Sequence, residues 1–482
     1  KHQNQQVDTL KSDIAAFHMQ GGAADAPVRL RSAVDGVKCC EKAGKKKPEG
    51  DKVTPPLDTL HLESETVISP AVDAALENAR SWFAWSLATP IAWLHLDTSV
   101  TACRNRKHQR VRDGAAFNLA LQQKCRTAFG DVYFTFWSFF AEEEFYLLSL
   151  PILFWNIDYR FARHMTLVVC FGLLWGNLLK DVFRLPRPKN VEPLVWVPKS
   201  ATHIDSTATR DFGFPSTHAM NSISNSLFTV LYCMQHGLAG KPVSGSWLCG
   251  GSAFWIFSIA FGRLYLGVHS PMDVKGGILL GLALVFICQR PVRLCDHFDR
   301  WMLTMPHVGV VLMTILIVLL ILNPQPRPMT PTFMQNCVLC GLIFGCSSGF
   351  RMETDRRRGR GIFGLSSPSP QDMAHVGSND LAMPVLVLRT VVGFALILLA
   401  RVVLKAVLVC FFHQVGLEPS PAKPVPRKDV ARQEKKQELK GWDLWAAAVV
   451  KTTVYAALSW TITCGCPAFF EAVLGLPCEM NG

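Results

Sequence analysis

Long runs of apolar residues are the feature that most restricts how this 482-residue chain can fold. Backbone polar groups in lipid must be satisfied within the segment itself, so a run of about 20 mainly apolar residues predicts a helix that crosses a bilayer. We identify candidate spans at residues 134–155, 165–179, 218–234, 247–266, 274–287, 305–322, 333–347, 384–412 and 442–476. The predicted fold is therefore all-α, a polytopic membrane helical bundle.

The composition supports this class. Hydrophobic residues make up 49% of the chain and charged residues only 18%, as in polytopic membrane proteins. The formal net charge of +12 lies in tails and loops and is accompanied by no aromatic-basic recognition module, so we expect membrane topology, not nucleic acid, to account for it. The sixteen cysteines lack the paired clusters of a zinc site, and we predict neither a metal nor another cofactor.

Four segments admit more than one interpretation. Residues 82–96 are apolar but short, which favours a helix lying in the membrane interface over a thin crossing. The run 134–155 contains Glu142, Glu143 and Glu144; we expect all three to be buried inside the bundle, the alternative being that the apolar part begins near residue 145. Residues 384–412 fit one long tilted helix or a re-entrant pair. The run 442–476 is broken by CGCP at 464–467 and can end in an interfacial helix.

Three short motifs carry most of the polar chemistry. They are KDVFRLPRP, FPSTHAMNS and FGRLYLGVHSPMD, which begin at Lys180, Phe214 and Phe261. Phosphoryl transfer requires cations that neutralise three equatorial oxygens while the attacking and leaving atoms lie in line, and the planar fork of arginine suits that task. Each motif alone is a weak signal, but their order and spacing indicate phosphate chemistry. The motifs supply three cations, two histidines, a hydroxyl group and a carboxylate: Lys180, Arg187, Arg263, His218, His269, Ser216 and Asp273.

The spacing suggests separate roles for the two histidines. Asp273 lies four residues after His269, one helical turn away, so its carboxylate can fix the tautomer of an imidazole that attacks phosphorus. His218 then remains as the general acid for the leaving oxygen, since imidazole titrates near ~6.5. Ser216 and the backbone amide of Thr217, at an expected helix start, can donate further hydrogen bonds to the phosphate.

A count of spans places the three motifs on one side of the membrane. The first motif follows the span that ends near residue 179, and the second begins the next span, so they share a loop. The third motif emerges two crossings later on the same side. Segments expected on the opposite side, at 158–164, 289–300 and 351–361, are rich in arginine. The positive-inside tendency makes these segments cytosolic and the motifs lumenal.

The three motifs resemble those of the lipid phosphate phosphatases of the type-2 phosphatidic acid phosphatase superfamily. The sequences PSTHAMNS and RLYLGVHSPMDV are most similar to the sphingosine-1-phosphate and long-chain-base phosphate phosphatases, and the similarity extends over about residues 134–290. The resemblance implies that His269 is the phosphate-attacking nucleophile, Asp273 its partner and His218 the acid. The remaining motif residues would form a phosphate cradle: Lys180, Arg187, Ser216, Thr217 and Arg263.

One position departs from the family pattern. Gly262 stands immediately before the arginine of the third motif, where the family usually has serine. This substitution puts one supporting hydrogen bond in question, but no proton-transfer role.

The resemblance and the apolar runs together predict a six-helix phosphatase-type core with extra C-terminal spans. The long loop 189–214 is expected either to act as a lid over a headgroup pocket or to pack as a surface loop. The expected regions are a disordered polar tail (1–80), an interfacial amphipathic region (81–130), the phosphatase membrane core (131–290), further transmembrane helices (291–412), a basic cytosolic linker (413–441) and a C-terminal membrane segment (442–482).

The expected function is that of an integral-membrane phosphatase acting on sphingosine-1-phosphate or related long-chain-base phosphates, through a phosphohistidine and without a metal. We expect it in the endoplasmic reticulum with the site facing the lumen, in contact with its lipid phosphate substrate and membrane lipids. The alternatives are a phosphatidic acid or polyisoprenyl diphosphate phosphatase, a lipid phosphotransferase, and a non-catalytic protein that binds or transports lipid phosphates. The motif spacing does not separate these alternatives.

Overall fold

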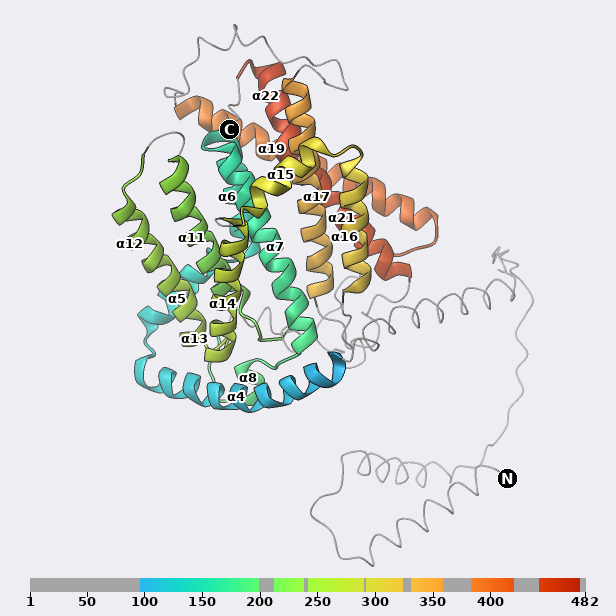
Figure 1. Cartoon of the computed structure of the whole chain (residues 1–482). Helices are drawn as coiled ribbons and strands as arrows, with labels where there is room; N and C mark the ends of the chain where they lie inside the picture. The colour runs from blue at the N-terminus through green and yellow to red at the C-terminus, as the bar shows by residue number, and fades with distance from the viewer. Residues whose placement is uncertain are drawn as a thin grey trace, which may run out of the picture. The chain divides into compact units, whose positions relative to one another are not determined.

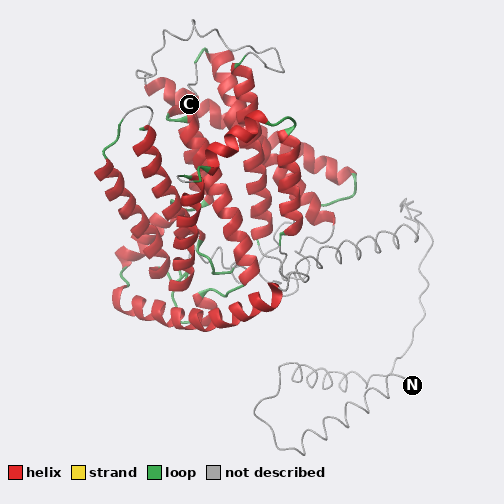
Figure 2. Ribbon diagram, viewed as in Figure 1, coloured by secondary structure: helices red, strands yellow, loops and turns green. Residues whose placement is uncertain are grey.

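The computed structural model describes residues 96–198, 212–237, 242–289, 292–323, 331–358, 383–419 and 442–476. Every regular element in these ranges is a helix (Figure 2), which confirms the predicted all-α class. The expected tail 1–80, the apolar segment 82–95 and residues 420–441 of the expected linker lie outside the described residues. Within the described ranges, six helical stretches are long and apolar enough to cross a membrane, as expected for a polytopic integral membrane protein: Tyr159–Val191, Gly245–Tyr265, Pro271–Cys288, Thr332–Arg357, Met383–Gln414 and Asp443–Leu474.

The first group of helices contains the motif-bearing segments. α7, α11 and α14 run side by side (Figure 1) and share a buried apolar core that includes Phe161, Val168, Phe228 and Leu284. α12 continues through a π-helical turn, η1, into the short α13. The elements of this group are α5 (Ala128–Phe139), α6 (Glu143–Asn156), α7 (Tyr159–Phe183), α11 (Thr217–His236), α12 (Gly245–Ile256), η1 (Phe257–Phe261), α13 (Gly262–Tyr265) and α14 (Pro271–Cys288).

Two helices lie across one end of this group. They are α4 (Leu96–Cys125) and the short α8 (Pro188–Val191), seen at the bottom of Figure 1. α4 buries Val111, Asn118 and Gln122 against the bundle, while most of its other described side chains are exposed. The region expected to be interfacial thus contains a helix that covers the ends of the motif-bearing helices.

The second group of helices packs on α7 through α17. α17 also packs along α21, and Gly341 and Gly345 of α17 lie so close to the α21 backbone, near Thr452 and Ala456, that a Cβ atom would collide with it. Small residues allow this close approach in many membrane proteins. The elements of this group are α15 (Leu294–Thr304), α16 (Val308–Leu322), α17 (Thr332–Arg357), α19 (Met383–Gln414), α21 (Trp442–Trp460), η3 (Thr461–Gly465) and α22 (Cys466–Leu474).

The structure differs from the sequence-based expectation at the run 134–155. This run forms two helices, α5 and α6, separated at residues 140–142. Glu143 and Glu144 are exposed and Glu142 is half-buried, so the expected burial of all three carboxylates inside the bundle is wrong. Successive helix positions point about 100° apart. In one straight buried helix, the three carboxylates would therefore point to different sides and be buried against apolar side chains. The break places them at a helix start.

Three later segments also differ from, or decide between, the sequence-based interpretations. The run 305–322 contains α16, whose 15 residues fall short of the roughly 20 needed for a crossing. Residues 384–412 lie within the single helix α19, so the re-entrant alternative does not apply. The run 442–476 is not broken at 464–467, because η3 continues α21 directly into α22.

The π-helical turn η3 is stabilised by contacts from the first group. A π turn shifts the backbone hydrogen-bond pattern away from that of an α-helix. Here the indole nitrogen of Trp155 donates to the backbone oxygen of Ile462, and the Tyr159 hydroxyl donates to that of Thr463, both at 3.0 Å. Residues from α6 and α7 therefore hold the C-terminal span where its sequence suggested a break.

The arginine-rich segments gather at the end of α7 opposite to the motifs. Arg163 and His164 of α7 pair with Asp299 of α15. Arg351 of α17 donates to the backbone oxygen of Met302 at 2.7 Å. α7 has 25 residues, which corresponds to about 37 Å at 1.5 Å per residue. The two ends of α7 are thus far enough apart to lie on opposite sides of a bilayer; the predicted side of each end stays a prediction.

Candidate active site

The first motif lies at the end of helix α7. Lys180 is in the last turn of this helix and is 6% exposed. The helix ends where Arg184 adopts a left-handed conformation. Beyond this point, a guanidinium nitrogen of Arg187 donates to the backbone oxygen of Val268 at 3.1 Å. This hydrogen bond joins the first motif to the third.

The second motif begins helix α11. Ser216 is its N-cap residue, and the Ser216 hydroxyl accepts a hydrogen bond from the amide of Ala219 at 3.4 Å. The amide of Ser216 donates to the backbone oxygen of Asp273 at 3.0 Å, which joins the starts of α11 and α14. This approach requires Gly277, because a Cβ atom there would overlap the backbone oxygen of Ser216. The amide of Thr217 belongs to the first helical turn, where amides lack partners within the helix and attract anions.

His218 follows in the first turn of α11. Its Nε2 atom is buried and has no hydrogen-bond partner among the described residues. The charges of Arg263, Lys180 and Arg187 all act on this ring. The three cations that the motifs supply therefore lie within electrostatic range of a single imidazole, and an anion bound among them would relieve their mutual repulsion.

The third motif places a buried arginine in the short helix α13, directly after the π-helical turn η1. Arg263 is 7% exposed, and a guanidinium nitrogen donates to the hydroxyl of Ser138 in α5 at 3.1 Å. At Gly262, a Cβ atom would lie 3.1 Å from Cδ1 of Phe134. A serine hydroxyl thus supports the arginine, although it comes from another helix. Sequence reasoning missed Ser138, and no local signal marks it, because it lies 125 residues away from Arg263.

His269 and Asp273 lie together at the start of α14. Both side chains are buried, and Nδ1 of the imidazole is 3.8 Å from Oδ2 of the carboxylate. This oxygen already accepts the amide of Ser270 at 2.8 Å, as part of a capping box. Nδ1 of His269 and Oδ1 of Asp273 have no partner among the described residues. A separation of 3.8 Å is too long for a hydrogen bond, but catalytic contacts often tighten when substrate binds.

The surroundings of His269 favour its neutral form. Burial, followed by the positive charges of Arg187, Arg263 and Lys180, holds the pKa of His269 well below its ordinary value. Because a lowered pKa leaves the imidazole unprotonated at neutral pH, a ring nitrogen keeps the lone pair that an attack on phosphorus requires.

Helix α4 holds the backbone of the third motif. The amide nitrogen of Asn118 donates to the backbone oxygen of His269 at 3.0 Å. One turn later, the amide nitrogen of Gln122 donates to the backbone oxygen of Tyr265 at 2.9 Å. Sequence reasoning also missed these two residues. The signal that could have found them is a pair of amides four residues apart on one face of a helix.

The described part of the loop after the first motif also packs against α4. The backbone amide and oxygen of Trp196 both bond to the Gln122 side chain at 2.9 Å, and the Arg126 guanidinium lies 3.6 Å from the Trp196 ring centroid. This part is a packed loop. Residues 199–211 lie outside the described residues, and the role of the loop as a lid stays a prediction.

The structure brings the predicted site residues to one end of the bundle. α7, α11 and α14 each contribute a helix end, and hydrogen bonds link the first motif to the third and the second to the third. Within the described ranges, no three His, Cys, Asp or Glu side chains are grouped so that they could hold a metal ion. The residues gathered at this end are Lys180, Arg187, Ser216, Thr217, His218, Arg263, His269 and Asp273.

Comparison with known proteins identifies the motif-bearing core. Residues 161–293 match the model of the PAP2 superfamily, so the chain contains a PAP2 superfamily domain. No solved structure gives a significant match.

Several curated proteins are similar over a longer stretch. The lipid phosphate phosphatase delta of Arabidopsis thaliana is 27% identical over 55% of this chain and 62% of its own length. The dihydrosphingosine 1-phosphate phosphatase of Schizosaccharomyces pombe is 25% identical over 62% of this chain and 68% of its own length. The sphingosine-1-phosphate phosphatase 2 of Mus musculus is 26% identical over 56% of this chain and 71% of its own length. The aligned part thus spans less than two thirds of the Arabidopsis protein.

We expect Ser138 to contribute to anion binding through Arg263. Ser138→Ala removes the hydroxyl that accepts from the guanidinium, and a hydrogen bond to a charged group contributes about 1.5–3 kcal/mol, or roughly tenfold or more in Kd. Titration of the purified protein with orthovanadate, a phosphate mimic, measures the change. Ser348→Ala on α17, whose hydroxyl donates to the backbone oxygens of Phe344 and Gly345 in its own helix, is the matched control. An unchanged vanadate Kd in Ser138→Ala would contradict this role.

Proposed function

We propose that this integral membrane protein is a lipid phosphate phosphatase that hydrolyses sphingosine-1-phosphate or a related long-chain-base phosphate. The single observation that carries the proposal is the meeting of three cations, two imidazoles and a carboxylate from three distant motifs at one end of the bundle. The names of the similar proteins from fission yeast and mouse support the class of substrate.

In the first half of the proposed reaction, His269 attacks the phosphorus atom. Its unprotonated nitrogen forms a bond to phosphorus while the bond from phosphorus to the lipid oxygen breaks. His218, which stays protonated once the charge of the bound phosphate offsets the charges of the three cations, gives a proton to that oxygen. The oxygen therefore leaves as a hydroxyl group of the lipid. The Asp273 carboxylate accepts a hydrogen bond from the ring nitrogen of the phosphohistidine that is not bonded to phosphorus.

In the second half, water hydrolyses the phosphohistidine. His218, now unprotonated, takes a proton from the water as its oxygen attacks phosphorus, and the bond from phosphorus to His269 breaks. Inorganic phosphate leaves and both histidines return to their starting states. Lys180, Arg187 and Arg263 neutralise the phosphoryl oxygens in both steps, while Ser216 and the amide of Thr217 donate hydrogen bonds to them.

Phosphate release from a panel of lipid phosphates tests the proposed function. Purified protein in detergent should release phosphate from long-chain-base phosphates faster than from phosphatidic acid or polyisoprenyl diphosphates. Because none of the proposed steps uses a metal ion, turnover should persist in excess chelator. Activity that is abolished by chelator and restored by magnesium would contradict the metal-free mechanism. Binding without turnover would favour a transporter or receptor.

The two histidine variants should behave differently. His269→Ala should lose both turnover and any acid-labile phosphoprotein. His218→Ala should lose about 10²- to 10⁴-fold on an alkyl phosphate, but less on p-nitrophenyl phosphate, whose leaving group needs little protonation. Rapid quench with labelled substrate measures both properties. Phosphate trapped on the protein in His269→Ala would reverse the assignment, and equal losses on both esters in His218→Ala would remove its acid role.

We also propose that the protein resides in the endoplasmic reticulum with the site facing the lumen. The support is the arginine-rich end of the bundle, formed around Arg163 and Arg351, which the positive-inside tendency assigns to the cytosol. A protease-sensitive tag inserted between Pro198 and Phe212 should be protected in sealed microsomes, whereas one inserted after Arg358 should be cleaved. The reverse pattern would place the site on the cytosolic face.

A further inference from the structure

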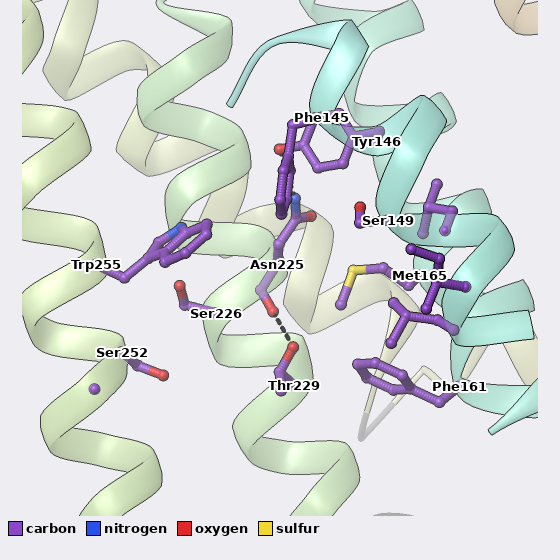
Figure 3. A pocket seen from close by; sticks show the side chains of 14 residues that line it. Phe145, Tyr146, Ser149, Phe161, Met165, Asn225, Ser226, Thr229, Ser252 and Trp255 are labelled. Atoms are coloured by element: carbon purple, nitrogen blue, oxygen red, sulfur yellow. Dashed lines mark hydrogen bonds between the residues drawn. The ribbon is translucent and has the colours of Figure 1, made fainter. Parts of the chain in front are cut away.

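A cavity of about 460 Å³ lies between α6, α7, α11 and α12. Figure 3 shows its apolar wall, in which Phe145, Phe161, Met165 and Trp255 take part. Its size falls in the range of about 300–1,000 Å³ that is usual for small-molecule sites. Gly251, at its edge, is exposed on the side of the bundle, where the bilayer would lie. A hydrocarbon chain therefore has both an apolar space and a lateral entrance.

One face of α11 connects this cavity to the candidate active site. His218, Asn221, Asn225 and Thr229 are spaced by three, four and four residues, so they lie along the same face of the helix. Asn225 and Thr229 line the cavity, whereas His218 lies in the first turn. At 1.5 Å per residue, the first and last of these positions are about 16 Å apart. The cavity thus begins roughly two turns from the proposed acid.

Asn221, between His218 and the cavity, is a buried amide with unused hydrogen-bonding capacity. It is 1% exposed, and neither its amide oxygen nor its amide nitrogen makes a hydrogen bond of good geometry with a described residue. It lies close to the Tyr146 hydroxyl, which accepts a hydrogen bond from the Asn225 amide at 3.0 Å. A buried polar group without a partner costs about 1–3 kcal/mol, so a ligand that supplies the partners would be bound preferentially.

We propose that this cavity binds the hydrocarbon chain of a single-chain lipid phosphate, and that Asn221 with the Tyr146–Asn225 pair binds the hydroxyl and amino groups beside its phosphate. This inference rests on the proposed function and specifies its substrate. A sphingoid base presents a hydroxyl and an ammonium group near the phosphate, and an amide can both accept from and donate to such groups. The ester carbonyls of a diacyl lipid phosphate only accept, and such a lipid carries a second chain.

A bound lipid would meet the polar contacts next to its phosphate and the apolar wall of the cavity further along its hydrocarbon chain. With phosphate among the cations near His218, the next groups of the lipid would lie beside Asn221. The chain would then continue past Asn225 and Thr229 into the cavity. This order along α11 matches the order of groups in a long-chain-base phosphate.

A pair of adjacent glycines on α12 allows a matched test of the cavity. Gly251 lines the cavity and Gly250 does not. A Cβ atom at either position meets no other atom within 4 Å, so a side chain can be added to each without a clash in the helix packing. Gly251→Phe should lower kcat/KM for sphinganine 1-phosphate by about tenfold or more and leave p-nitrophenyl phosphate, which has no chain, unchanged. Gly250→Phe should leave both unchanged.

A second variant tests the polar contacts. Asn221→Leu keeps the shape of the side chain and removes its hydrogen-bonding atoms. Its kcat/KM for sphinganine 1-phosphate should fall by about tenfold. Its kcat/KM for octadecyl phosphate, which has neither the amino nor the hydroxyl group, should equal that of the wild-type protein. Equal effects on the two lipids would overturn the assignment of Asn221.

The outcomes separate this inference from the proposed function. If the unchanged protein releases phosphate from none of the substrates, the proposed function fails. If it is active but Gly251→Phe affects sphinganine 1-phosphate and p-nitrophenyl phosphate equally, or affects neither, the cavity does not hold the chain. The subsite is then wrong although the phosphatase assignment stands.

Discussion

The junction between the first turns of α11 and α14 is the contact on which the site depends. The amide of Ser216 donates to the backbone oxygen of Asp273, and the Asp273 carboxylate in turn accepts the amide of Ser270. These bonds fix two helix starts against each other, with His218 in one and His269 just before the other. Because a helix start carries amides without internal partners, the junction also directs positive potential toward the place where phosphate would bind.

The site is built from groups that a membrane bundle ordinarily excludes. α11 buries Asn221, Ser222 and Ser224, and it is not among the six stretches apolar enough to cross a membrane by composition. Polar and charged side chains in such surroundings are costly and usually functional. Residues outside the motifs support the site: Ser138 accepts a hydrogen bond from Arg263, and Asn118 of α4 donates to the backbone of the third motif.

The second group of helices carries none of the motifs but stabilises the helix on which the first motif lies. Near the site, the Thr332 hydroxyl at the start of α17 donates to the Asp181 carboxylate at 2.6 Å, directly beside Lys180. Further along α7, the Asn177 amide donates to Asn336 at 3.1 Å. α17 therefore holds the end of α7 that carries Lys180.

The sequence by itself determined the helical membrane class and the residue types at the site, because these follow from composition and motif spacing. Only the tertiary structure decided which distant side chains support the motifs. Ser138, Asn118 and Gln122 act on residues 125 to 151 positions away, a relation without local periodicity. The same reason explains why the sequence suggested a break at 464–467: the partners that hold η3, Trp155 and Tyr159, lie on other helices.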